Sequence, residues 1–127
     1  MKVRGTDFVL YEVSDLARSI AFYRDNLGLT LTENLEEYGW AELQAGPLTL
    51  ALFDPAKMRT EAPEPRVGGA AVFLAVQGVR EAVEELRGKG VKVLMEFMET
   101  PVCCQAIVAD PDGNVIGLHE RRDGSFG

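Results

Sequence analysis

Hydrophobic and polar positions along the first half of the chain predict one strand, one helix and three further strands. Leu16, Ile20 and Tyr23 recur at helical spacing. Ser14 can accept hydrogen bonds from the free N–H groups at the start of this helix, and Gly28 can end it. The strands are expected at residues 8–13, 29–34, 39–44 and 48–53.

The second half repeats this order of elements. A shift of 63 positions superposes the two halves and places Leu16 on Val79. The helix that begins near Val79 is expected to end around Gly88 and Gly90. Strands are expected at 70–76, 91–97, 105–109 and 115–120. Each half is therefore predicted to be a β-α-β-β-β module, and the fold class is α+β with two such modules in tandem.

Proline and glycine are concentrated in residues 54–69, a composition typical of a linker or an exposed excursion. Module one is expected at about residues 5–54 and module two at about 69–121, with 55–68 as the linker. A unit of about 55 residues would be marginally stable alone. We therefore expect one domain over 1–127, in which the two sheets support each other or a second copy of the chain supports both.

The charge balance bears on the class of partner. The chain has 20 acidic and 13 basic residues and a net charge of −7. A field of this sign repels nucleic acids and anionic lipids, so neither is expected to bind. No leader-type apolar stretch begins the sequence, and no apolar segment reaches the roughly 20 residues that a membrane-spanning helix needs. We expect a cytoplasmic protein.

The two cysteines, Cys103 and Cys104, are neighbours in the sequence. Adjacent residues do not easily reach unstrained disulfide geometry. With a single histidine in the chain, they also make a poor zinc site, which wants four convergent ligands. A structural role is favoured, and a redox or ligand-contacting thiol is left open.

Two segments resemble a known family. Residues 13–29 read VSDLARSIAFYRDNLGL, and residues 110–118 read DPDGNVIGL. The first is similar to the first-helix signature of the vicinal oxygen chelate superfamily, and the second to its last hairpin. This superfamily includes glyoxalase I, extradiol dioxygenases, fosfomycin-resistance enzymes and bleomycin-resistance proteins. The resemblance implies a glyoxalase/bleomycin-resistance-type fold, with curved mixed sheets around a central cavity, and a homodimer.

The resemblance also bears on metal binding. In the metal-dependent members, side chains at four equivalent strand positions hold one divalent ion. Carried over by the two motifs, these places fall on Phe8, Ala51, Ala71 and Gly117. None of these side chains presents a lone pair. Shifting a strand alignment would bring in Asp7 or His119, but a slip by one residue also turns the core side chains to the wrong face. We expect no metal and no other cofactor.

Alternation of period two sorts the strand residues into two faces. One set should pack under the helices. Leu10, Thr49 and the candidate ligand-binding residues form the other set, which should line the cavity; those candidates are Phe8, Trp40, Glu42, Ala51, Phe53, Ala71, Phe73, Gln105, Ile107, Gly117 and His119. Aromatic rings beside very small residues are typical of an apolar pocket with flat walls. We expect the small residues to leave space for a ligand, with the alternative that aromatic side chains fill that space.

Glu42 and His119 are the candidates for polar chemistry. The imidazole could act as a base or a hydrogen-bond partner. Glu42, beside Trp40 on an inward face, would either be solvated or receive a cationic group. Glu12 and Glu120 are expected at the rims of the cavity. The acidic run at residues 33–37 is assigned no chemistry.

Several functions remain open. We favour a metal-free protein that binds a small apolar or aromatic molecule, with a cationic group favoured by the negative field. The first alternative is a metal-independent lyase or isomerase that uses His119 and Glu42. The others are a metal-dependent enzyme like glyoxalase or the dioxygenases, and an interaction module that uses exposed sheet edges. The sequence therefore leaves open whether the protein is an enzyme.

Overall fold

The computed structural model describes residue 2 and residues 8–57 and 71–125. The chain divides into two compact units, Met1–Pro65 and Arg66–Gly127. The boundary between them lies inside the segment predicted to be a linker. Asp7, most of that linker and position 70, where the second module's first strand was expected to begin, lie outside the described residues.

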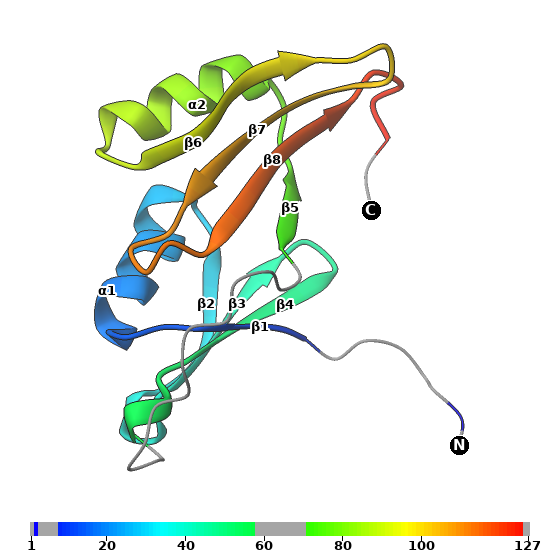
Figure 1. Cartoon of the computed structure of the whole chain (residues 1–127). Coiled ribbons are helices and arrows are strands. Elements are labelled where there is room, and N and C mark those ends of the chain that lie inside the picture. The colour runs from blue at the N-terminus through cyan, green and yellow to red at the C-terminus, as the bar shows by residue number, and fades with distance from the viewer. Residues whose placement is uncertain (1, 3–7, 58–70, 126–127) are drawn as a thin grey trace. The chain divides into compact units, whose positions relative to one another are not determined.

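The first unit contains a mixed four-stranded sheet in the order β1-β4-β3-β2 (Figure 1). β1 runs parallel to β4, and the other neighbouring pairs are antiparallel. In chain order the elements are β1 (Val9–Glu12), α1 (Leu16–Ala21), the π-helical turn η1 (Phe22–Asn26), β2 (Thr30–Leu35), η2 (Glu36–Tyr38), β3 (Trp40–Ala45), β4 (Leu48–Phe53) and η3 (Pro55–Lys57). The predicted order of strands and helix is confirmed.

The second unit repeats the first. Its sheet has the order β5-β8-β7-β6, with β5 parallel to β8 (Figure 1). The elements are β5 (Val72–Ala75), α2 (Val79–Gly88), β6 (Lys92–Glu99), β7 (Cys103–Ala109) and β8 (Val115–Arg121). Val9 pairs with Leu50 in the first sheet, and Val72 pairs with Ile116 in the second. The internal repeat therefore extends to the pairing of the strands.

One face of each sheet packs under the helix of its own unit, as the alternation predicts. In the first unit Tyr11, Leu50 and Leu52 are buried on the face that α1 contacts. In the second, Val72 and Leu118 are buried on the face toward α2. We call the opposite side of each sheet its distal face. All candidate ligand-binding residues on the strands belong to the distal faces.

The start of α1 differs from the expectation. Asp15, not Ser14, is the N-cap residue, and its Oδ1 accepts a hydrogen bond from the Arg18 N–H at 3.1 Å. Both side chains can cap a helix, so the sequence alone does not fix which of two neighbours takes extended backbone geometry. The predicted end is confirmed, since Gly28 has a φ of 74°.

Two residues at the start of the proline- and glycine-rich segment are packed rather than exposed. Asp54 and Pro55 are buried. The Asp54 N–H donates to the carbonyl of Gly39 at 2.8 Å, and its Oδ1 accepts from the Ala56 N–H at 3.0 Å. The expectation of an exposed excursion is wrong at these positions, because the backbone after β4 continues against the start of β3. β7 also begins earlier than expected, at Cys103.

Candidate functional site

The register of the first sheet arranges the distal-face side chains in rows across the strands. One row contains Glu12, Phe53, Trp40 and Leu35, and the next contains Leu10, Ala51, Glu42 and Glu33. Each row takes one residue from β1, β4, β3 and β2 in turn. The sheet thereby brings aromatic and acidic side chains from separate parts of the sequence onto one surface.

Two aromatic rings of these rows, Trp40 and Phe53, form a cluster with the ring of Phe8, which immediately precedes β1. We call these three residues the aromatic cluster. The Phe8 and Trp40 rings meet edge to face, with centroids 5.4 Å apart. The Trp40 and Phe53 rings are tilted by 54°, with centroids 6.0 Å apart. Phe8 keeps 42% of its surface exposed. The cluster therefore combines fixed ring geometry with accessible apolar area.

The cluster covers the small residue beneath it. Phe8 precedes the row of Leu10 and Ala51, whereas Trp40 belongs to the row beyond it. Contact between the two rings requires both to lean over the row that lies between them. Ala51 is fully buried. This packing favours the alternative in which aromatic side chains fill the space at Ala51.

Glu42 supplies the acidic group beside the cluster. Its Oε1 accepts a hydrogen bond from the Trp40 indole N–H at 3.1 Å. This hydrogen bond uses one carboxylate oxygen of Glu42 and restricts rotation of the Trp40 indole ring. Glu42 also lies directly opposite Glu33, on β2. Two like charges opposite each other on one sheet face are unfavourable unless a cation or water screens them.

Glu33 is a residue that the sequence did not indicate. The register that brings it opposite Glu42 depends on an irregularity between Leu31 and Glu33 in β2. A bulge of this kind shifts every later residue by one position. The one available signal was the acidic run itself, which a solvent-facing segment explains equally well.

The second unit places a ring over its own small residue. Phe73 on β5 is the parallel partner of Gly117 on β8. A Cβ atom at Gly117 would overlap three consecutive atoms of the Phe73 ring, Cγ, Cδ1 and Cε1. The His119 ring stands nearly perpendicular to it, at 82°, with centroids 6.4 Å apart. The space expected at Gly117 is therefore also taken by an aromatic ring.

Other candidates of the second unit surround this ring. His119 is the cross-strand partner of Gln105, and Gly117 is that of Ile107. Ala71 immediately precedes β5 and is exposed. These residues share the distal face of the second sheet with Phe73. The pair proposed for catalysis is divided between the units, with Glu42 in the first and His119 in the second, so their convergence stays a prediction.

Glu120 does not belong to the distal face. Its Oε2 accepts a hydrogen bond from the Gly78 N–H, at the start of α2, at 3.0 Å. A carboxylate at a helix N-terminus is favourably placed toward the free N–H groups there. The expectation of a rim position is wrong for Glu120, because its side chain points to the helix side of the sheet. Glu12 lies on the distal face of the first unit, opposite Phe53.

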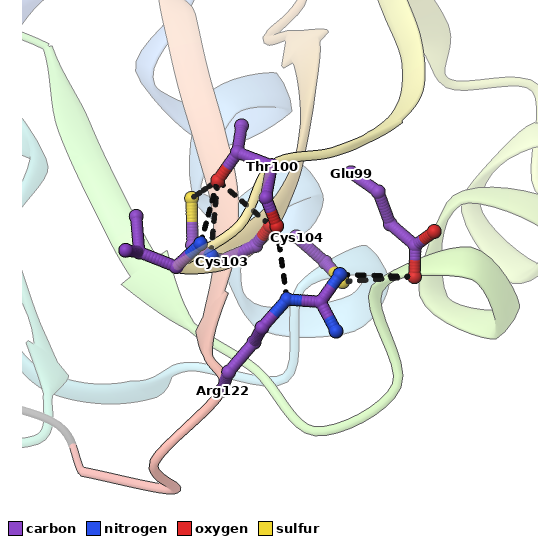
Figure 2. Close-up of polar contacts among 6 residues, drawn as sticks. Glu99, Thr100, Cys103, Cys104 and Arg122 are labelled. Carbon is purple, nitrogen blue, oxygen red and sulfur yellow. Dashed lines mark hydrogen bonds and ion pairs between the residues drawn. The ribbon is translucent and has the colours of Figure 1, made fainter.

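The two cysteines lie in the polar network that closes the β6–β7 hairpin (Figure 2). Both are free thiols. The Cys103 Sγ lies 3.2 Å from the Thr100 hydroxyl, and the Cys104 Sγ lies 4.0 Å from a Glu99 carboxylate oxygen. Arg122 donates from Nε to the Thr100 carbonyl at 2.9 Å. These contacts agree with a structural role, which stays a prediction.

The places that the resemblance assigns to metal ligands do not fit an ion. Phe8 and Ala51 in the first unit, and Ala71 and Gly117 in the second, have no donor atom. The Phe73 ring covers Gly117, and the Phe8 ring packs against Trp40. Within residues 8–57 and 71–125, no group of three or more His, Cys, Asp or Glu side chains could hold a metal ion. Metal independence remains an expectation that metal analysis must test.

The chain matches the family model described as the Glyoxalase/Bleomycin resistance protein/Dioxygenase superfamily over residues 5–118. It is 33% identical over 126 residues to the lactoylglutathione lyase of Salmonella typhimurium, with 93% of each chain covered. It is 32% identical to the enzyme of the same name from Escherichia coli O157:H7, with the same coverage. The chain belongs to this superfamily, and the predicted resemblance is confirmed at that level.

Solved structures of similar fold include proteins with different names. The lactoylglutathione lyase from Agrobacterium tumefaciens has a TM-score of 0.74 and 25% identity, covering 94% of this chain and 96% of that one. TnmS3, an antibiotic binding protein from Streptomyces sp. CB03234, has a TM-score of 0.75 and 27% identity, covering 95% and 98%. The glyoxalase-type fold is thereby confirmed, and the same fold is used both for an enzyme and for a binding protein.

Among the residues that the structure describes, no helix is long and apolar enough to cross a bilayer.

Proposed function

We propose that this protein binds a small organic molecule with a flat apolar or aromatic part, without a metal. The observation that carries the proposal is the aromatic cluster of Phe8, Trp40 and Phe53 beside the carboxylate of Glu42. A binding protein gains affinity by removing flat apolar area from water, and one polar group fixes the orientation. The antibiotic-binding relative shows that the superfamily contains binding proteins.

The charges in the first unit favour a ligand with a cationic group. Glu42 and Glu33 face each other on the distal face, and the chain carries a net charge of −7. A ligand cation near Glu42 would relieve the repulsion between the two carboxylates. Affinity for such a ligand should fall as salt concentration rises.

Trp40 is the only tryptophan in the chain, so its fluorescence reports on the cluster. We expect quenching or a spectral shift on titration with aromatic amines and antibiotics. Phe53→Leu should weaken binding several-fold, since one aromatic pair is worth about 0.5–1.5 kcal/mol. Tyr38→Leu removes an exposed ring outside the cluster and is the matched control. No response to any compound of a broad panel would contradict the proposal.

Catalysis is the second candidate, because the sequence relatives are lactoylglutathione lyases. The candidate residues are His119 and Glu42, acting without metal. The test is conversion of lactoylglutathione, measured with the purified protein, with divalent metals added in a parallel series. Turnover that His119→Gln and Glu42→Gln both abolish would favour the metal-independent enzyme. Turnover that requires added metal and survives both changes would favour a metal-dependent one.

A homodimer in the cytoplasm completes the proposal. A chain of two small modules gains stability when a second copy covers exposed surface. Sedimentation should give twice the 13.9 kDa of one chain. A single species at the monomer mass over a wide concentration range would contradict the dimer.

A further inference from the structure

We infer that the Phe73 ring packs directly on the backbone at Gly117, a contact that we call the seat. We further infer that the ring held in this way makes the second unit select flat ligands over puckered ligands of equal charge. The inference rests on the proposed function and names the class of ligand, a planar aromatic molecule. It also gives Gly117 a role: the residue lacks a side chain because a ring occupies the place where the side chain would be.

The ring lies with one face toward the glycine. A Cβ atom at Gly117 would be close to Phe73 Cγ, Cδ1 and Cε1 together. One point can be nearly equally near three consecutive ring atoms only above the plane of the ring. Phe73 nevertheless keeps 49% of its surface exposed. One face of the ring therefore rests on the backbone of β8, and its other face is accessible to a ligand.

His119 borders the seated ring on the same sheet face. Its imidazole stands at 82° to the Phe73 ring, two residues along β8 from the seat. A neighbouring ring at this angle restricts rotation of the Phe73 ring about its Cβ–Cγ bond. Gln105, the cross-strand partner of His119, adds a second polar side chain. A flat ring stacked on Phe73 would thus find hydrogen-bonding groups near its edge.

The first unit has no ring packed on a glycine at the corresponding position of the repeat. Leu10 and Ala51 are parallel partners at the point of the repeat where the second unit has Phe73 and Gly117. The combined change from Phe and Gly to Leu and Ala has therefore already been accommodated once on this fold. In the Leu–Ala pair one side chain is smaller than in the Phe–Gly pair and the other is larger. The Leu–Ala pair is therefore a suitable reference for a double-mutant cycle at Phe73 and Gly117.

The first experiment tests the seat by stability. Gly117→Ala should lower the urea midpoint, because the new methyl group overlaps the ring. In the background of Phe73→Leu the loss should fall to less than half. Phe97→Leu is the matched control, since the Phe97 ring packs under Arg80, with the guanidinium carbon 3.9 Å from its centroid. It should leave the loss unchanged. Equal losses in the wild-type and Phe73→Leu backgrounds would overturn the seat.

Gly117→Ala alone could fail to fold. In that case, recovery of folded protein in the Phe73→Leu/Gly117→Ala double variant supports the seat. An unfolded double variant beside a folded Phe73→Leu protein contradicts it, because the ring is then not what the methyl group meets.

The second experiment tests selection with two probes of equal charge, 1-naphthylmethylamine and its fully saturated decalin counterpart, titrated by calorimetry. The wild type should prefer the flat amine by about two- to tenfold, the size expected of one aromatic pair. Phe73→Leu should remove this preference, and Phe97→Leu should retain it. An unchanged preference in Phe73→Leu overturns the inference and leaves the proposed function standing. Binding of neither amine counts against both.

Discussion

Gly39 lies where the start of β3 approaches the backbone that follows β4. Its φ is 69°, and a Cβ atom there would lie 2.5 Å from the carbonyl oxygen of Asp54. Two separate costs therefore oppose a side chain, the left-handed backbone and the close approach of a rigid carbonyl group. Because the Asp54 N–H donates to the Gly39 carbonyl, the approach cannot widen without losing that bond.

We predict that Gly39→Ala lowers the free energy of unfolding by about 1–3 kcal/mol. Gly46→Ala is the control, since Gly46 also has a positive φ, of 62°, but no atom lies within 4 Å of its missing Cβ. The control should show only the cost of the backbone conformation. Urea denaturation of the two variants measures the difference, and equal losses would show that the Asp54 carbonyl moves away freely.

Ser19 is the opposite case, a polar side chain buried among apolar ones. It is fully buried on α1, and its Oγ has no hydrogen-bond partner among the residues described. A buried hydroxyl without a partner costs about 1–3 kcal/mol relative to an apolar group of the same shape.

Ser19→Ala should therefore raise the urea midpoint, by an amount that corresponds to about 1 kcal/mol or more. Ala17→Ser, at an exposed position of the same helix, reports the difference in helix propensity alone, about half a kcal/mol or less. If Ser19→Ala gains no more stability than Ala17→Ser loses, the Ser19 hydroxyl forms a hydrogen bond in solution and the interpretation is wrong.

At the scale of elements, an ion pair links the end of α2 to its neighbouring strand β6. The Arg87 guanidinium bonds a carboxylate oxygen of Glu96, on β6. The hydrogen bond from Arg87 is the main cause that lowers the pKa of Glu96 below its ordinary value. The pKa of Glu96 is lower in the folded chain than in the unfolded chain. The ion pair therefore stabilises the fold at pH values above the pKa that Glu96 has in the unfolded chain.

That contribution should disappear as the pH falls through the lowered pKa of Glu96. We predict that Glu96→Gln is less stable than the wild type at about pH 7, and that the difference shrinks toward zero as the pH falls below the ordinary carboxyl range. Urea midpoints at several pH values measure this, and Glu37→Gln on η2 controls for the change in net charge. A constant difference across the pH range would contradict the assignment to the carboxylate.

The order of elements could be predicted because periodicity records which face of an element is buried. The faces of β1, β4 and β5 follow from alternation alone. The choice between Ser14 and Asp15 as cap could not be made, since it depends on one backbone angle. The partner of Glu33 depends on a bulge, which leaves no distinct residue type in β2.

At the scale of the whole molecule, alternation predicted which residues share each distal face but not how their side chains pack there. Alternation places Ala51 and Gly117 on the distal faces, where small side chains suggested empty space. The rings of Phe8, Trp40 and Phe73 instead cover them. Alternation fixes the side of a sheet on which a ring begins, but torsion angles decide which neighbour it covers.

Because each module is small, association should contribute to the stability of the whole molecule. For a dimer that unfolds to two separate chains, each tenfold rise in protein concentration adds about 1.4 kcal/mol of apparent stability per dimer. We predict that the thermal midpoint rises by a few degrees for each tenfold step. Differential scanning calorimetry over two decades of concentration measures this. A midpoint independent of concentration would mean that the two modules of one chain stabilise each other without a second copy.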